Sequence, residues 1–247
     1  MTLNTIVYES NFREILNKDS WFFNNNLKSI THRLLTCNNI TNLNEFNDLV
    51  DKMKLLYKFD LVHVSDFKDK ANEFFKLNID ENTKGYLYTM PYFVSILNVK
   101  TSHILNIASD CMDDIKVDDT FISEAISELE TNPKCASVMV AWTKDNYVMK
   151  NGLKVAEYEQ SEYQIPDDNP KFNYSKGFTD QFFLNSIYNL KKINYNVDSN
   201  YASGIYNGPT YGGNSFEKRM VAHQAYNKTY NCTSKGDCYY IHDNNYY

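Results

Sequence analysis

The sequence predicts an α/β fold in which helices flank a mixed, mostly parallel β-sheet. Apolar strand-like segments and amphipathic helical segments alternate between residues 29 and 142, which is the pattern of a parallel sheet with helical crossovers. A chain of 247 residues is long enough for one large α/β domain with a substantial core. Its content of 43% hydrophobic and 23% charged residues is ordinary for a soluble globular protein.

The first half of the chain contains the clearest strand and helix signals. Residues 1–28 are expected to form a helical or irregular lead-in. Apolar residues at helical spacing predict a helix over residues 42–59, and Asn44 is expected to cap its start. The helix of residues 118–133 begins with acids and stops at an Asn-Pro pair. The expected order is strand 29–40, helix 42–59, strand 60–67, helix 85–100, strand 102–110, helix 118–133 and strand 135–142.

After Trp142 strand-like and helix-like segments no longer alternate regularly, and the second half is expected to be more irregular. Thr179 is a plausible N-cap for a helix, and Asp180 would then lie in the first turn of that helix. The expected elements are a hairpin with a loop at residues 144–172, helices at 177–193 and 216–230, and a final strand within 238–247.

Charge and missing motifs exclude several classes of function. The net charge of −6 argues against a generic nucleic-acid binder, because affinity for phosphates needs a basic surface. The sequence has no Gly-rich phosphate loop, no Gly-x-Ser-x-Gly nucleophile elbow and no zinc-type His or Cys spacing. It also lacks a run of about 18 apolar residues and a signal peptide, so we expect no transmembrane segment and a cytoplasmic location.

The cysteines point to a reducing environment. There are five, an odd number without a repeated spacing, which favours reduced thiols. The closest-spaced pair is Cys232 and Cys238, in the polar loop NCTSKGDC. For this pair a local disulfide and half of a metal site are both alternatives to two separate thiols.

Polar residues follow three of the expected strands, at residues 36–39, 65–66 and 109–110. Ligands of parallel α/β sheets bind outside the carboxyl ends of the strands, so a ligand crevice is expected there. A carboxylate at a strand end, such as that of Asp110, can hold Mg²⁺ or Mn²⁺, which prefer oxygen ligands. The alternative is that Asp110 only caps the next turn.

Two further residues have both a functional and a structural interpretation. A carboxylate at the start of a helix can face a cleft, which makes Asp180 a candidate general base. The alternative is that Asp180 only compensates the helix dipole. His242 is either a surface histidine, or a ligand or switch residue on a loop that folds back over the site.

The order of these elements resembles that of GT-A (Rossmann-like) nucleotide-sugar glycosyltransferases, close to family 2, over roughly residues 30–245. In that class a first strand leads into a loop at the nucleobase, here TCNNI, and a second ends in a polar or acidic residue, here HVSD. A later strand ends in Asp-x-Asp, here ILNIASD, and a helix matching FISEAISELETNP follows. An acidic motif then opens a helix in the acceptor half, here FTDQFFL, and a late histidine, here His242, completes the metal shell.

This resemblance implies one GT-A domain over residues 1–247, with a nucleotide-binding half at about 30–142 and an acceptor half at about 143–247, or one domain of a longer protein. It implies an inverting hexosyl- or deoxyhexosyltransferase that moves a sugar from a UDP- or GDP-sugar to a hydroxyl of a glycan or other acceptor. Asp180 would be the general base, while Asp110 and His242 would hold Mn²⁺ or Mg²⁺ at the diphosphate. The residues implied to contact the nucleotide sugar are Thr36, Asn38, Asp66, Ser109 and Asp110.

One departure from the family pattern favours an alternative. Ala108 stands where the family often has the first carboxylate of Asp-x-Asp, so only Asp110 of that motif is present. A non-catalytic nucleotide- or sugar-binding module of the same fold is therefore the second hypothesis. A nucleotidyltransferase is a third, but such enzymes usually need an N-terminal Gly-rich loop, which this chain lacks.

Overall fold

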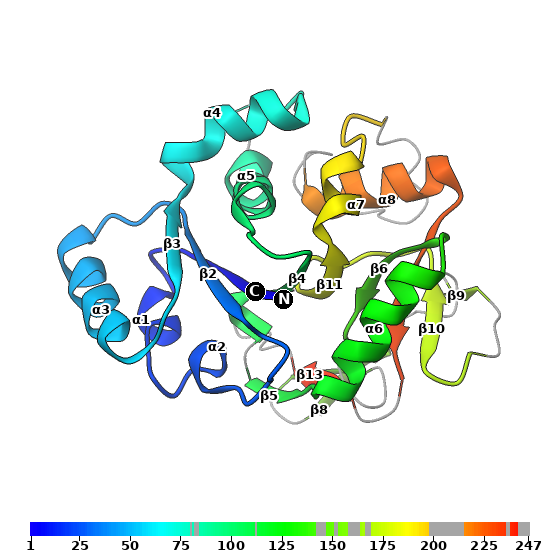
Figure 1. The fold of residues 1–247 in the computed structure, drawn as a ribbon, viewed down its shortest axis with the longest axis horizontal. Helices are drawn as coiled ribbons and strands as arrows, with labels where there is room; N and C mark the ends of the chain where they lie inside the picture. The colour runs from blue at the N-terminus through cyan, green and yellow to red at the C-terminus, as the bar shows by residue number, and fades with distance from the viewer. Residues whose placement is uncertain are drawn as a thin grey trace.

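The protein is built around one mixed β-sheet with helices on both of its faces (Figure 1). The computed structural model describes residues 1–79, 81, 84–111, 113–141, 147–150, 153–157, 164–165, 169–197, 215–235 and 238–241. Within these residues the main sheet has nine strands in the order β3-β2-β1-β4-β11-β6-β12-β10-β9. They are β1 (Thr2–Val7), β2 (His32–Cys37), β3 (Asp60–His63), β4 (His103–Ile107), β6 (Cys135–Met139), β9 (Gln164–Ile165), β10 (Phe172–Ser175), β11 (Phe182–Ser186) and β12 (Tyr230–Ser234).

The strand directions confirm the predicted mixed, mostly parallel sheet. Strand β1 lies between β2 and β4 and is parallel to both, and β3 is parallel to β2. Strand β11 is antiparallel to its neighbours β4 and β6, whereas β12 is parallel to β6. The carboxyl ends of β1, β2, β3, β4, β6 and β12 therefore point to the same edge of the sheet.

Strand β1 corrects the expectation of a helical or irregular lead-in. All six of its residues are buried, because it lies in the middle of the parallel part of the sheet. Its polar residues Thr2, Asn4 and Thr5 interrupt the apolar run that a buried strand usually shows. A buried hydrogen bond 2.7 Å long from Asn4 to Asn106 of β4 accommodates this polar side chain. The polar residues therefore make the strand unrecognisable from its sequence pattern.

The helices expected at residues 42–59, 85–100 and 118–133 are present, whereas the helix of residues 64–75 was not predicted. The side chain of Asn42 caps α3 by accepting a hydrogen bond from the Glu45 N–H, so Asn44 is not the cap. Helix α4 begins at Val64 directly after β3, which places Asp66 in a helical first turn and not at a strand end. The helices are α1 (Phe12–Ile15), α2 (Trp21–Asn24), α3 (Leu43–Leu56), α4 (Val64–Phe75), α5 (Lys84–Asn98) and α6 (Asp119–Thr131).

The predicted helix over residues 177–193 is wrong in its first part. Phe182–Ser186 form β11, and only Ile187–Lys192 form a helix, α7, capped by the Ser186 hydroxyl. Phe182, Phe183 and Leu184 are all buried, because β11 lies inside the sheet with helices above and below it. A continuous apolar run of this length fits a buried strand and a buried helix equally well by periodicity alone.

The hairpin, the helix at residues 216–230 and the final strand follow the sequence prediction, whereas strands β9, β10 and β12 were not predicted. The first part of the expected polar loop NCTSKGDC belongs to β12, which is buried because it pairs with β6 and β10. Strands β7 (Tyr147–Lys150) and β8 (Leu153–Glu157) form an antiparallel hairpin. The helix expected at residues 216–230 is α8 (Phe216–Asn227). The final strand, β13 (Tyr239–Ile241), pairs with β5 (Asp113–Lys116) in a separate two-stranded sheet. None of the helices that the structure describes combines the length and apolar character needed to cross a lipid bilayer.

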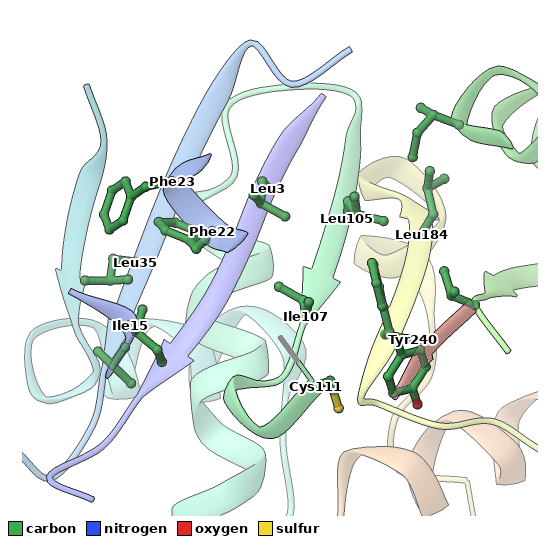
Figure 2. Close-up of a cluster of buried hydrophobic side chains, with 14 of the residues drawn as sticks. Leu3, Ile15, Phe22, Phe23, Leu35, Leu105, Ile107, Cys111, Leu184 and Tyr240 are labelled. Atoms are coloured by element: carbon green, nitrogen blue, oxygen red, sulfur yellow. The ribbon is translucent and has the colours of Figure 1, made fainter. Parts of the chain in front are cut away.

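Two hydrophobic cores lie on opposite faces of the sheet. One joins the strands to α1, α2, α3 and α6, and the other joins them to α4, α5, α7 and α8. Figure 2 shows the first core, where Leu3, Leu105 and Leu184 project from three adjacent strands. With both faces covered, the edge formed by the carboxyl ends of the strands is where the sheet meets its loops.

Candidate active site at the carboxyl edge of the sheet

The loops that follow the parallel strands meet at one edge of the sheet, which we call the carboxyl rim. Tyr8 follows β1, Asn38 follows β2 and Ser109 follows β4. Because β11 runs the opposite way, the residues before it reach the same edge. The Ala108 N–H donates to the carbonyl oxygen of Gln181 over 2.6 Å, which ties the end of β4 to the segment that contains Asp180.

Asn11 links the loop after β1 to the loop after β4. Its Nδ2 donates to the Ser109 hydroxyl over 2.6 Å, and its Oδ1 accepts from the Tyr8 N–H over 2.8 Å. The rings of Tyr8 and Tyr88, from the start of α5, lie with their centroids 5.8 Å apart. Two aromatic rings and two polar side chains are therefore gathered at the ends of β1 and β4.

A buried polar network crosses the sheet and ends at Asp180. The Thr36 hydroxyl lies 2.8 Å from that of Ser95 in α5 and donates to Oδ1 of Asn4 over 3.2 Å. Asn4 donates to Asn106, whose Nδ2 donates to the main-chain carbonyl of Asp180 over 3.0 Å. All four side chains are at most 1% exposed. Buried polar networks of this kind hold their members in one arrangement when every member is paired.

Asp180 and Glu217 form what we call the acid pair. Glu217 lies in the first turn of α8, which the Ser215 hydroxyl caps. Its Oε1 accepts from the Asp180 N–H over 3.2 Å, and it also hydrogen-bonds to the Asp180 carboxyl and the Thr179 hydroxyl. Burial raises the pKa of Glu217 above its ordinary value, and these hydrogen bonds only partly oppose that effect. Two carboxyl groups in contact cannot both ionise easily, so the pair tends to share a proton.

The main chain of Asp180 is fixed from three directions. Its carbonyl oxygen accepts from Asn106 and from the Tyr92 hydroxyl over 3.2 Å, and its N–H donates to Glu217. Asp180 therefore lies in a loop before β11 and not in the first turn of a helix, and the interpretation as dipole compensation is wrong. This removes the main structural alternative to a functional role for its carboxyl group.

The sequence-predicted site residues take different positions in the structure. Ser109 and the backbone of Asp110 lie in a short 3₁₀ turn at the rim (Ser109–Cys111). Asn38, which follows β2, donates a hydrogen bond to the Leu87 carbonyl of α5. Thr36 is fully buried inside the polar network. Asp66 is exposed in α4, where it accepts a hydrogen bond from Ser65. The Asp110 side chain and His242 lie outside what the structure describes, so their metal role stays a prediction.

Sequence reasoning missed Glu217 and Asn11. Glu217 follows a capping serine, which is an ordinary helix start and gives no sign of a contact with Asp180. Asn11 lies in the segment that was expected to be an irregular lead-in. Both gain their significance from strands and helices that are distant in sequence, so only the three-dimensional arrangement identifies them.

The donors at the rim suit a hard divalent cation in their chemistry. The hydroxyl of Ser109 and the two carboxyl groups of the acid pair offer oxygen, which Mg²⁺ and Mn²⁺ prefer. The acid pair is, however, engaged in its own hydrogen bonds. Among the described residues, one group of three metal-ligating side chains occurs, and it consists of Glu128, Cys135 and Cys232, away from the rim.

Comparison with known proteins identifies the fold. No protein-family model and no curated protein sequence matches the chain. The structure of S. aureus TarS matches with a TM-score of 0.52 and 11% identity, over 98% of this chain and 36% of that one. TarS 1–349 in complex with UDP matches with a TM-score of 0.50 and 14% identity, over 98% and 60%. Mouse xyloside xylosyltransferase 1 has a TM-score of 0.46 and 12% identity, over 92% and 82%.

These similarities concern the fold, because the identities are low. The two TarS matches extend over nearly the whole chain and confirm the predicted GT-A-like α/β fold. The chain covers less than two thirds of either TarS structure.

Proposed function

We propose that this protein is a metal-dependent glycosyltransferase that moves a sugar from a nucleotide-diphosphate sugar to an acceptor hydroxyl with inversion. The observation that carries the proposal is the acid pair at the carboxyl rim of a GT-A-like sheet. Ligands of open α/β sheets bind at this edge. A carboxyl group with a perturbed pKa at such an edge is a candidate for proton transfer.

Asp180 is the proposed general base. Its main chain is held by Asn106, Tyr92 and Glu217 before any substrate arrives, which limits the reorganisation needed for reaction. Burial raises the pKa of Glu217, so we propose that Glu217 is the member of the acid pair that holds a proton and that Asp180 carries the negative charge. The acceptor oxygen forms a bond to the anomeric carbon as the bond from that carbon to the diphosphate oxygen breaks. The Asp180 carboxylate takes the proton of the acceptor hydroxyl.

The donor side of the proposed site is formed by the residues that follow β2 and β4. Asn38, Ser109 and Asp110 are proposed to contact a UDP- or GDP-sugar, and Asp110 with His242 to hold Mn²⁺ or Mg²⁺. A bound cation would neutralise the charge that builds on the leaving diphosphate. Thr36 and Asp66 stay proposed nucleoside contacts. The burial of Thr36 favours an indirect effect, through Asn4 and the polar network.

A donor screen is the first test. Melting temperatures are measured with UDP- and GDP-sugars, each with and without Mn²⁺, because a ligand that binds only the folded state raises the melting temperature. We expect one nucleotide class to stabilise the protein, and to do so more strongly with Mn²⁺. If no nucleotide sugar raises the melting temperature under either condition, the proposed donor class is wrong.

Nucleotide release with the best donor then tests the chemistry. Asp110→Ala should lose both metal-dependent binding and release, whereas Asp180→Asn should retain binding and lose turnover. Asp48→Asn, the same acid-to-amide change on the exposed face of α3, is the matched control and should release nucleotide at the wild-type rate. Full activity of Asp110→Ala in Mn²⁺ buffer would contradict the metal assignment.

Ala108 favours a second candidate function, a nucleotide- or sugar-binding module that has lost the chemistry. The first carboxylate of the family motif is missing at this strand end. A binding module would be stabilised by a nucleotide sugar in the melting assay but would release no nucleotide, even slowly, in Mn²⁺ buffer. The two assays together therefore separate the two functions.

A further inference from the structure

A second cluster of reactive side chains lies on the other side of the sheet from α5. Cys135 is the first residue of β6, Cys232 lies in the adjacent strand β12, and Glu128 lies near the end of α6 (Figure 1). The two sulfur atoms are 3.0 Å apart, and the Cys232 Sγ lies 3.8 Å from Oε1 of Glu128. We call these three residues the thiol site. Because Cys135 begins β6, the site lies toward the amino ends of the parallel strands, away from the carboxyl rim.

The Glu128 carboxylate is oriented toward the sulfurs by its own partners. Its Oε1 accepts from Asn132 Nδ2 over 2.6 Å and from the Tyr174 hydroxyl over 3.3 Å. Asn132 also donates to the Tyr230 hydroxyl, and the rings of Tyr174 and Tyr230 stack with centroids 4.6 Å apart. Supporting partners of this kind fix the orientation of ligands around bound metals.

The spacing of the three ligand atoms fits a tetrahedral soft cation. With zinc–sulfur and zinc–oxygen bonds of about 2.3 and 2.1 Å, tetrahedral ligands lie about 3.8 Å apart for two sulfurs and about 3.6 Å apart for sulfur and oxygen. The observed sulfur–oxygen distance of 3.8 Å is close to this value, and the sulfurs, now 3.0 Å apart, need to separate only slightly. All three ligand atoms lie within 4.8 Å of one another.

We propose that Glu128, Cys135 and Cys232 bind a zinc ion, with a water molecule as fourth ligand. Two thiolates with one carboxylate form a donor set that suits Zn²⁺ and not Mg²⁺. Both cysteines are at most 4% exposed, whereas Glu128 is only partly buried and leaves solvent within reach of the fourth position. A bound zinc would tie α6 to two strands of the sheet.

The surroundings of Cys232 favour its protonated form as long as no cation is bound. Contact with Cys135, burial and the nearby Glu128 all raise the pKa of the Cys232 thiol. Without a cation, this thiol therefore stays protonated. Metal binding releases protons from coordinating thiols, and so zinc affinity should rise with pH.

Strand register argues against a disulfide at the thiol site. Cys135 is paired with Tyr230, and Cys232 is paired with Val138, with a bulge in β6 between the two pairs, so the cysteines are offset by two residues along β12 and by three along β6. The offset along β12 is about 6.6 Å, and with about 4.8 Å between strands it places the Cα atoms about 8 Å apart. Disulfides usually need Cα atoms closer than about 7 Å, so oxidation would require the backbone to move.

The test uses the full chain, reduced and stripped of metal with a chelator. Zinc alone is then titrated in competition with a chromophoric zinc indicator, and cobalt(II) is added in parallel as a spectroscopic probe of sulfur ligation. We expect one zinc per chain, a cobalt–thiolate charge-transfer band, and a higher melting temperature with zinc. Wild-type protein that binds no zinc, or that binds cobalt without a thiolate band, would overturn the proposal.

Variants locate the bound metal. Cys135→Ser and Cys232→Ser should each lose the zinc, and Asn132→Ala should weaken binding by about 10- to 100-fold as the loss of a supporting partner does elsewhere. Cys238→Ser is the matched control, because it removes the other cysteine near Cys232 and should keep the zinc. Loss of zinc in Cys238→Ser with retention in Cys135→Ser would place the metal in the terminal loop and refute the site. Should the cysteine variants fail to fold, the wild-type cobalt spectrum and the Asn132→Ala affinity still decide the question.

Discussion

The carboxyl rim and the thiol site each contain a glutamate from a helix, yet the two glutamates have different chemical surroundings. Glu217 contacts the carboxyl group and the N–H of Asp180, so its partners among the described residues offer oxygen and nitrogen. Glu128 contacts a thiol, an amide and a phenol. The residue type alone therefore does not define either site. The neighbouring groups define each site. Those at the carboxyl rim suit proton transfer, and those at the thiol site suit the binding of a soft metal ion.

The two clusters also differ in how they are connected to the rest of the molecule. The acid pair is connected by hydrogen bonds to a polar network that crosses three strands, from Thr36 through Asn4 and Asn106. The thiol site depends on the end of α6 and on the adjacent strands β6, β12 and β10. If this comparison is right, a variant of one cluster should leave the chemistry of the other unchanged.

The largest expected effect is that of Asp180→Asn on turnover. Loss of a general base typically lowers the rate by about 100- to 10,000-fold, and the amide retains the size of the carboxylate. We expect nucleotide affinity to stay near the wild-type value, and zinc binding in the indicator assay to be unaffected. Turnover at the wild-type rate would remove Asp180 from the base role. A simultaneous loss of zinc would show that the two clusters are not independent.

The next effect in size is that of Asn106→Ala, which removes the last member of the polar network. The Nδ2 of Asn4 loses its acceptor, and a buried polar group without a partner costs about 1–3 kcal/mol. The Asp180 carbonyl loses one of its two donors and keeps the Tyr92 hydroxyl. We expect a lower free energy of unfolding in urea and reduced turnover. Asn185→Ala is the matched control, because it removes a buried asparagine of β11 that donates to Ala136 instead. An equal fall in turnover in both variants would mean that general destabilisation explains it.

A third prediction concerns the pH dependence of stability. The folded-state pKa of Glu217 lies above its ordinary value of 4.5 because of burial, so its contribution to stability is present below that value and is lost as pH rises through the folded pKa. Glu217→Gln should therefore raise the melting temperature relative to wild type at neutral pH, and the difference should shrink toward pH 4.5 and below.

Asp119 provides the control of opposite sign. Hydrogen bonds from the Ser29 hydroxyl and from the N–H groups of Lys28 and Ser29 lower the pKa of Asp119 below its ordinary value of 3.8. Its contribution is present above that value and is lost as pH falls through the folded pKa. Asp119→Asn should therefore lower the melting temperature at neutral pH. If Glu217→Gln behaves like Asp119→Asn, burial is not the dominant influence on Glu217.

Much of the parallel half could be predicted, because its elements follow simple local rules. Strands β2 and β4 have apolar centres, and α6 has a capping acid, Asp118, and an apolar stripe. Among the elements that were not predicted, β1 and β11 show why pattern alone was insufficient. The polar residues of β1 are paired through the buried network, and the apolar run of β11 gives no periodicity that separates a strand from a helix. In each case a distant part of the chain decides the local structure.

The candidate sites show the same limit. Ser109 and Asp180 were predicted to belong to one site, and the ends of β4 and β11 bring them to one edge of the sheet. Glu217 was not predicted to belong to this site, because its contact with Asp180 depends on where α8 begins. For Cys232 the sequence suggested the nearby Cys238 as a partner, whereas the fold brings Cys135 into contact from the adjacent strand. Spacing in sequence identifies local pairs, but neither cluster is local.

The smallest expected effect, that of Thr36→Val, decides between two roles for this residue. Valine keeps the shape and removes the hydroxyl that donates to Asn4, which should cost about 1 kcal/mol of unfolding free energy. Thr5→Val is the matched control in the neighbouring strand, because the buried Thr5 hydroxyl has no hydrogen-bond partner among the described residues and its loss should not destabilise. If Thr36 acts only through the network, nucleotide affinity in Thr36→Val should stay within about twofold of wild type, whereas loss of a direct hydrogen bond to the nucleoside should weaken binding by about tenfold. A tenfold loss without destabilisation would place Thr36 in the donor site, as the sequence predicted, and would mean that the rim opens further into the sheet than its burial in this structure indicates.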